Sequence, residues 1–263
     1  MIIDMHAHAF TDKIAEKAIG NLAVTSGLEP CGNGTIAALK EYMKRDGVDI
    51  SVVLNIAQKP GKSARVINEW AKSVEDESII SFGSVHPFSE DAVEEVFHIQ
   101  SMGLRGIKFH PTYQLFDVDD RRVYPTYEAI QETGLPVVFH AGFDPLDKTR
   151  DYGLPHQFAK VIRDFPRMRI ILAHMGAMNH WEEFLELLAG KNLYIDTAVC
   201  ARYMEPKYAE RIMKQHGLER VLLGSDFPWD SIAHEMEWFE QMDFTSRQKD
   251  MIFSENARAL LGI

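Results

Sequence analysis

The stretch IIDMH, at residues 2–6, is the first of eight short apolar runs that recur along the chain. Most of these runs are rich in Val, Ile, Leu and Phe and are too short for helices, which is typical of buried parallel strands. The other seven are ISVVLNIA (50–57), IISFGSVH (79–86), LRGIKFH (104–110), PVVFHA (136–141), IILAHM (170–175), LYIDTAV (193–199) and VLLGSD (221–226). The pattern therefore predicts eight buried strands.

Segments with helical spacing separate these runs. Ile36, Leu39 and Met43 stand at i, i+3 and i+7, and the apolar residues of 93–97 stand at i, i+3 and i+4 with acidic residues on the other faces. Alternating strands and helices imply right-handed βαβ units and a parallel sheet. Eight such units favour an α/β fold of the closed (β/α)8 TIM-barrel type, which usually takes ~250 residues. No glycine-rich phosphate loop follows any run. We expect one domain over residues 1–263.

Composition and charge limit the classes of partner. The chain has 263 residues and a formal net charge of -11. Such acidity argues against nucleic acid or an anionic membrane as a partner, because both require clustered Lys and Arg, but it leaves an anionic small molecule open as the substrate. Cys31 and Cys200 form no disulfide framework. With no signal peptide and no run of about 18 apolar residues, we expect a cytoplasmic protein.

Polar side chains gather where the predicted strands end. In a TIM barrel the carboxyl ends of the strands share one rim, and active sites form there. On this rim the sequence places His6, His8, His86, Lys108, His110, His140, His174, Asp196 and Asp226. Three long connections follow strands, at residues 9–35, 111–122 and 142–155. We expect them to cover the rim as lids or substrate loops.

The opening strand carries a candidate metal site. His6 and His8 stand two residues apart, so in a strand both side chains project to the same face. Together they can hold one divalent ion, and His140 and Asp226 could complete a mixed nitrogen and oxygen site. The H-x-H pattern alone more often marks a polar strand end, and the further histidines at later strand ends with an acid at the eighth strand favour the metal site. His174 is predicted to be an acid/base residue or a ligand of a second metal, and Asp226 is also expected to take up a proton.

Other rim residues are predicted to contact the substrate. Lys108 has three interpretations: it neutralises a substrate anion, it is carboxylated and bridges two metals, or it pairs with buried Asp4 or Asp196. Asp4 is expected to lie one layer beneath the two histidines and to orient one of them. Substrate contacts are further predicted for His110, Arg202 and Trp229, with packing as the alternative for each.

Several segments resemble the amidohydrolase superfamily. They are DMHAH (4–8), VVFHAG (137–142), ILAHMG (171–176) and LLGSDFPW (222–229). The closing ENARALLGI (255–263) resembles the amidohydrolase-2, or amidohydrolase-related, branch. That branch includes aminocarboxymuconate semialdehyde decarboxylase and similar enzymes. The resemblance runs from residue 2 to the C-terminus, with the motifs in the right order at the right strands.

This resemblance implies a ligand set and an acid/base residue. It implies that His6, His8, His140 and Asp226 bind one divalent metal, usually zinc, with manganese also seen in the group. It further implies that His174 is the acid/base residue that positions the water. These assignments come from the matching motifs, and they agree with the strand-end pattern described above.

The reaction itself has two main interpretations. The segment GIKFHP (106–111) is more similar to hydrolase-type members, and binuclear members carry a carboxylated lysine on this strand, where Lys108 stands. The leading hypothesis is a metal-dependent hydrolase that opens a lactone, ester or amide of a small anionic substrate with metal-activated water. The alternative is a non-oxidative metal-dependent decarboxylase of a small carboxylic acid. A third interpretation is a non-catalytic binding protein on the same barrel. The segment MEWFEQM (236–242) fits a homo-oligomer interface or a helix face.

Overall fold

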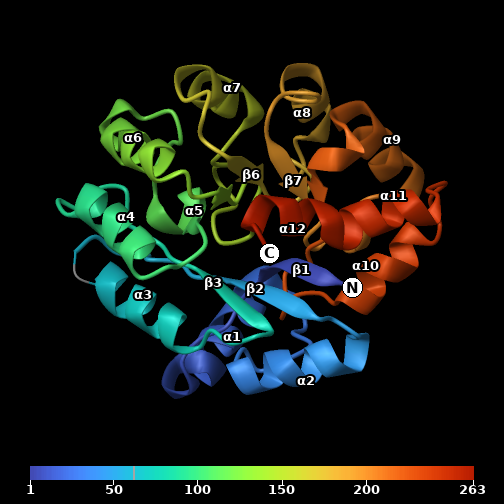
Figure 1. The fold of residues 1–263 in the computed structure, drawn as a ribbon, viewed down its shortest axis with the longest axis horizontal. Helices are drawn as coiled ribbons and strands as arrows, with labels where there is room; N and C mark the ends of the chain where they lie inside the picture. Colours follow the sequence, from blue (N-terminus) through green and yellow to red (C-terminus); the bar gives the residue numbers. More distant parts are fainter. Residues whose placement is uncertain (62) are drawn as a thin grey trace.

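The computed structural model describes residues 1–61 and 63–263, and within them eight strands alternate with helices (Figure 1). The strands are β1 (Ile3–Ala7), β2 (Ile50–Leu54), β3 (Ile79–Phe82), β4 (Ile107–Phe109), β5 (Val137–Phe139), β6 (Ile170–Leu172), β7 (Tyr194–Asp196) and β8 (Val221–Leu222). The α-helices are α1 (Asp12–Ser26), α2 (Ile36–Asp46), α3 (Ser63–Ser73), α4 (Ala92–Ser101), α5 (Pro111–Gln114), α6 (Tyr124–Thr133), α7 (Pro155–Asp164), α8 (Trp181–Leu187), α9 (Pro206–His216), α10 (Ile232–Phe239), α11 (Ser246–Asp250) and α12 (Asn256–Leu261). Each strand lies within one of the predicted runs or one residue beyond it.

The strands close into a barrel. Neighbouring strands pair in parallel in the orders β1-β2-β3 and β4-β5-β6-β7-β8. Two isolated bridges join these sheets at both open edges. Gly83, just after β3, pairs with Ile107 of β4, and Ala7 of β1 pairs with Phe227, which follows β8. The predicted (β/α)8 TIM barrel is therefore confirmed, and it brings the carboxyl ends of all strands to one rim.

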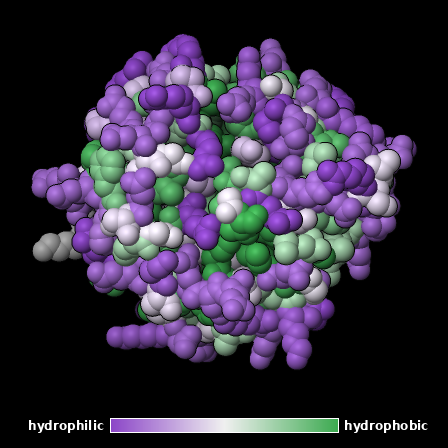
Figure 2. Space-filling view, viewed as in Figure 1, coloured by the Kyte–Doolittle hydropathy of each residue, from purple (hydrophilic) through white to green (hydrophobic). Residues whose placement is uncertain are grey.

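Apolar side chains fill the barrel and close one of its ends. The interior cluster contains Ile3, Met5, Val52, Leu54, Ile80, Phe82, Val138, Ile171 and Leu222. Helix α12 adds Ala257, Leu260 and Leu261 to this cluster and so covers the amino-terminal end of the barrel (Figure 1). Seen from the same side, the surface is mostly hydrophilic, with apolar residues near the C-terminus at its centre (Figure 2). Polar residues line the other end of the barrel, where the carboxyl ends of the strands lie.

The first strand departs from strict alternation. Its pairing with β2 shifts register between Asp4 and Ala7. Met5 belongs to the interior cluster and the next residue, His6, lines the cavity at the rim. Asp4 lies on the outward side, where the Tyr42 hydroxyl of α2 donates to it at 3.4 Å. The expectation that Asp4 lies beneath the histidines on their own face is wrong, because a β-bulge re-aims the side chains.

The helices around the barrel test two expectations, one about a membrane-spanning segment and one about residues 236–242. Among residues 1–61 and 63–263, none of the helices combines the length and the apolar character needed to cross a membrane. Within residues 236–242, Trp238, Phe239 and Met242 are buried in the core of the chain itself. These side chains therefore form a helix face, and a homo-oligomer stays a prediction.

His216, at the end of α9, is a buried histidine away from the rim. Its Nδ1 accepts from the Gly190 amide at 3.2 Å, and its Nε2 donates to the Leu193 carbonyl at 3.0 Å. Burial lowers the pKa of His216 from 6.5 to about 4. The folded protein therefore keeps this ring neutral at pH 5, where the unfolded chain binds a proton.

Acidification is expected to destabilise the fold through His216. Between pH 7 and pH 5 the unfolded state takes up a proton that the folded state does not, which lowers the free energy of unfolding by about 2 kcal/mol. His216→Gln, which keeps a donor and an acceptor, should remove this part of the pH dependence. Urea denaturation at both pH values measures it, with exposed His156→Gln as the control. Equal pH dependence in wild type and H216Q would contradict the prediction.

Candidate active site

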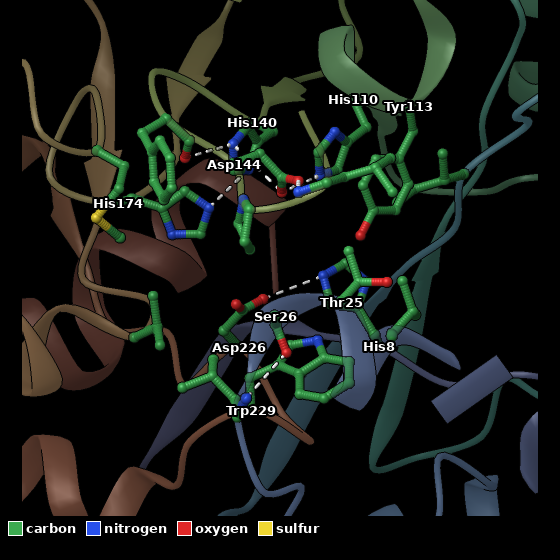
Figure 3. Close-up of a pocket in the computed structure, with 18 of the residues that line it drawn as sticks. His8, Thr25, Ser26, His110, Tyr113, His140, Asp144, His174, Asp226 and Trp229 are labelled. Atoms are coloured by element: carbon green, nitrogen blue, oxygen red, sulfur yellow. Dashed lines mark hydrogen bonds and ion pairs between the residues drawn. The ribbon is translucent and has the colours of Figure 1, made fainter. Parts of the chain in front are cut away.

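Three of the predicted ligands meet at the carboxyl end of the barrel. His6 Nε2 lies 3.2 Å from His8 Nε2 and 3.3 Å from Asp226 Oδ1, and His8 Nε2 lies 3.1 Å from that oxygen (Figure 3). Donors ~2.1 Å from one ion, at angles of about 100° to each other, are themselves ~3.2 Å apart. These three residues, the triad, are therefore spaced as ligands of one divalent cation.

The hydrogen bonds of the two imidazoles leave their lone pairs directed at this point. His8 Nδ1 lies 3.0 Å from the Leu54 carbonyl oxygen, which only accepts, so Nδ1 carries the proton. His6 Nδ1 lies 2.8 Å from Asp196 Oδ2 and donates to it. With Nδ1 of each ring turned toward an acceptor, both Nε2 atoms face the Asp226 carboxylate. Acceptors that face one another repel unless a cation lies between them, so this donor set fits a divalent metal.

Asp226 is held by the turn that follows β8. Its φ is 67°, in the left-handed region, and its amide donates to the His6 carbonyl at 2.8 Å. The Asp4 carboxylate accepts from the Ser225 hydroxyl at 2.6 Å, from the Ser225 amide at 3.0 Å and from the His6 amide at 3.1 Å. Asp4 therefore ties β1 to this turn. The residue that orients the His6 imidazole is Asp196, where the sequence had pointed to Asp4.

His140, the fourth predicted ligand, lies beside the triad and not within it. It follows β5, and its Nδ1 lies 2.9 Å from His174 Nε2 (Figure 3). His174 Nδ1 faces the Ala198 carbonyl at 3.0 Å and His140 Nε2 faces the Phe143 carbonyl at 3.2 Å, so the remaining nitrogens of the two rings face each other. The rings of His174 and His6 are 5.4 Å apart. The structure thus brings His140 and His174 to the wall next to the triad, and their roles stay predictions.

A second group of nitrogen and oxygen donors lies across the site. Asp144 Oδ2 is 3.5 Å from His110 Nε2 and 3.8 Å from His140 Nε2, and all three residues are buried. The two imidazoles stack, with centroids 4.1 Å apart and planes inclined by 9°. Imidazole lone pairs lie in the ring plane, so in stacked rings they run side by side and do not converge. This group therefore suits a metal ion less well than the triad does.

Burial sets the protonation states of the site. It lowers the pKa of His6, His110 and His140 well below the ordinary histidine value, so these imidazoles are neutral at neutral pH. Burial alone would raise the pKa of Asp226. The nearby histidines, His8 first among them, bring that pKa below its ordinary value. An ionised carboxylate and neutral imidazoles are the forms that bind a metal.

The triad opens into a cavity of about 260 Å³, the reaction cavity. Its floor carries Lys108 of β4, which is fully buried and has its Nζ 3.3 Å from His6 Nε2. Burial lowers the pKa of Lys108 to about 8, against the opposing effect of Asp196 and other acids. The walls are largely apolar and include Phe10, Leu22, Leu28, Ile56, Phe143, Met178, Val199 and Trp229. A cationic floor with apolar walls suits a small anion with an apolar body.

The remaining predicted substrate residues divide into two groups. His110 and Trp229 line the reaction cavity. Arg202 is not among its lining residues, and its Nε instead pairs with the nearly fully buried Asp230 carboxylate at 3.0 Å. A local acid thus occupies the guanidinium that was expected to hold a substrate anion. Lys108 is the predicted cation that the structure does place at the cavity floor.

The three long connections do cover the rim, and they bring residues that the strand-end pattern missed. Tyr113, from the connection after β4, stacks on His110 with ring centroids 3.8 Å apart. Asp144 lies in the connection after β5, and burial raises its pKa to about 6. Its position four residues after strand-end His140 was the only sequence signal for it. The connection after β1 forms helix α1, whose inner side chains roof the cavity.

The fold and the triad define a TIM-barrel protein with a candidate metal centre at the carboxyl ends of its strands. The family model described as Amidohydrolase (Amidohydro_2) matches residues 3–263. The chain therefore belongs to the amidohydrolase-2 family, as its sequence motifs predicted, and it is an enzyme of that family.

Solved structures share this fold over their whole length. A 5-carboxyvanillate decarboxylase from Sphingomonas paucimobilis has a TM-score of 0.72 at 17% identity, covering 100% of this chain and 99% of that chain. A dihydroxybenzoic acid decarboxylase from Polaromonas sp. JS666, with bound manganese and the inhibitor 2-nitroresorcinol, has 0.70 at 17%, covering 99% and 96%. A probable 2-pyrone-4,6-dicarboxylic acid hydrolase from Acinetobacter baumannii, with citric acid bound, has 0.69 at 17%, covering 100% and 99%.

One curated sequence relative is considerably longer than this chain. A probable dihydroorotase of Schizosaccharomyces pombe is 21% identical over 184 residues, which are 66% of this chain and 48% of the relative. The chain thus spans about half the length of that relative. At these identities the comparisons establish the family and the fold, and the particular reaction has to be argued from the site.

Proposed function

We propose that the chain is a metal-dependent decarboxylase, a carbon–carbon lyase, that acts on a small carboxylic acid with an unsaturated, largely apolar body. The observation that carries this proposal is the reaction cavity, which joins the triad and Lys108 at its floor to apolar walls. The carboxylate would meet the cationic floor while the body of the acid packs against the walls. The likeness in fold to decarboxylases of 5-carboxyvanillate and of a dihydroxybenzoic acid supports the proposal.

His6, His8 and Asp226 would hold the metal, with His140 on the adjoining wall as the proposed fourth ligand. The metal would be zinc or manganese, and the decarboxylase from Polaromonas contains manganese. A divalent metal bound there supplies a Lewis acid that polarises the bound acid. Asp196 fixes the imidazole of His6 through a hydrogen bond of 2.8 Å, so the ligand is already oriented in the protein.

The reaction needs one proton and releases one neutral molecule. A proton joins the carbon that bears the carboxylate. The bond between that carbon and the carboxylate carbon then breaks, and its electrons restore the π system as carbon dioxide leaves. The proton comes from solvent, and His174 and Asp226, which line the cavity, are the proposed residues that would pass it to the substrate carbon. Lys108 would hold the carboxylate before reaction, and this attraction ends when the charge is lost. The apolar walls keep competing water away from the reacting carbon.

Hydrolysis is the second candidate. The hydrolase from Acinetobacter shares the fold, and the probable dihydroorotase is a sequence relative, which are the observations that favour it. The same cavity would take a lactone, ester or amide that carries an anionic group, held at Lys108. Ionised Asp226 would accept a proton from the attacking water. The two reactions differ in what they consume and release, and a single assay separates them.

The test measures carbon dioxide and the incorporation of water in the same reaction. Protein loaded with Mn²⁺ is incubated in ¹⁸O-water with a panel of hydroxybenzoates, dienoic acids and pyrone lactones, and the gas and products are analysed by mass spectrometry. We expect one carbon dioxide for each acid consumed, and no activity after chelation. Lactone opening with ¹⁸O in the product and no carbon dioxide would make the chain a hydrolase instead.

A further inference from the structure

A second hollow adjoins the reaction cavity beneath helix α1. It has a volume of about 330 Å³ and is lined by Phe10, Ala18, Asn21, Leu22, Thr25, Gln58, Tyr113 and Leu146. Most of these side chains also line the reaction cavity, and the shared ones are Phe10, Leu22, Thr25, Tyr113 and Leu146. The hollow, called here the α1 subsite, therefore adjoins the reaction cavity, in which the triad lies.

One face of α1 forms the roof of this subsite. The face is made of Ala18, Asn21, Leu22 and Thr25. These positions follow i, i+3, i+4 and i+7 spacing, so their side chains lie along a single stripe of the helix. The buried residues of α1 are Ala15 and Ile19, at the edge of that stripe. The helix is thus anchored at its side and leaves its inner face open to a ligand.

The chemistry of the α1 subsite differs from that of the reaction cavity. None of its lining residues carries a charge, although 25% of the chain is charged residues. Asn21, Gln58 and Thr25 offer amide and hydroxyl groups, and Leu22 and Leu146 offer apolar area. Asn21 and Gln58 are exposed, so the subsite is partly open to solvent, and its lining offers a charged group no opposite charge. An uncharged group with one polar unit and an apolar chain, such as an acylamino group, matches this lining.

The wall between the two spaces is well supported. Tyr113 lines both, and its ring stacks on His110, which stacks in turn on His140. A substrate whose carboxylate lies at Lys108 would therefore extend past Tyr113 toward α1. We propose that the α1 subsite binds an uncharged extension of the substrate, on the side of the molecule away from the reacting carboxylate. This inference rests on the proposed function for the position of the carboxylate.

The test compares two probes that share a carboxylate and differ in the extension. Isothermal titration calorimetry of the Mn²⁺-loaded protein gives the affinities for benzoate and for 4-(butanoylamino)benzoate. We expect wild type to prefer the extended probe. Ala18→Phe fills the subsite from α1 and Gln58→Phe fills it from the opposite wall, and each should lower this preference about tenfold. Val24→Phe, at a position of α1 that is 87% exposed, is the matched control and should keep it.

The outcomes separate this inference from the proposed function. The subsite is overturned if wild type binds both probes equally, or if A18F and Q58F both keep the wild-type preference. Carbon dioxide release from hydroxybenzoates is measured on the same proteins. Release without a preference for the extended probe leaves the decarboxylase standing and removes the subsite. A preference that A18F and Q58F abolish, without any carbon dioxide release, supports the subsite and removes the decarboxylase.

Discussion

Asp226→Asn is expected to lower turnover by about three orders of magnitude and to reduce the metal content from about one ion per chain toward zero. Asp226 is the anionic member of the triad, whose other donors are imidazole nitrogens 3.1–3.3 Å from it. An amide in the same place gives a weaker, uncharged donor. Metal content by inductively coupled plasma mass spectrometry, together with carbon dioxide release, measures both effects.

The fold should survive this change, because the backbone holds the turn around Asp226. The Asp226 amide donates to the His6 carbonyl, and the Asp4 carboxylate holds Ser225. Circular dichroism and a thermal melt check this, and the exposed Asp243→Asn serves as the control with full metal and activity. Full metal content and full turnover in D226N would contradict the metal centre. Two ions in the wild type would instead indicate a second ligand set at His140 and His174.

Much of the fold could be predicted because burial leaves a pattern in the sequence. A parallel strand enclosed on both faces is apolar at every position, so runs such as residues 50–57 are visible without structure. The eighth strand is only Val221–Leu222, yet the run 221–226 revealed it. The bulge in β1 could not be predicted, since nothing in residues 4–7 marks it and strict alternation is the expectation for any strand. That one shift turns His6 inward next to interior Met5, while Asp4 stays on the outward side.

The candidate site was predictable where it lies at strand ends and not where it lies on loops. The triad comes from the ends of β1 and β8, so the barrel fixes its members together once the strands are known. Asp144 is placed by the path of its loop, where Gly142 at φ 83° lies too close to the Met178 backbone for any side chain. Helix α1 was expected only as part of the connection 9–35, and its inner face packs on a cavity and not on a core. Loop conformation of this kind has no simple periodic signature.

Lys108→Met is expected to lower kcat/KM for a carboxylate substrate by about 100-fold to 1000-fold while the metal content stays unchanged. Lys108 is fully buried at the cavity floor, and methionine has a similar length without the charge. Truncating one partner of a buried charge pair costs about 2–5 kcal/mol of binding, or about 30-fold to 4000-fold, and the expected loss lies within these limits. Kinetics with the substrate found in the carbon dioxide assay measure the effect, and the exposed Lys191→Met is the control.

The stability of this variant decides how its kinetics are understood. Replacing Lys108 alone leaves the nearby buried carboxylates, Asp196 first among them, without their cation, which lowers stability. We therefore expect the Tm of K108M to lie below that of wild type, so the kinetics are measured well below this Tm, where circular dichroism shows that the variant is folded. Loss of metal along with the lysine would mean that Lys108 is a bridging ligand, carboxylated between two ions. Unchanged metal content together with a lower kcat/KM would mean that Lys108 binds the substrate carboxylate and not the metal. Its Nζ, 3.3 Å from His6 Nε2, lies beside the triad in a position to do so.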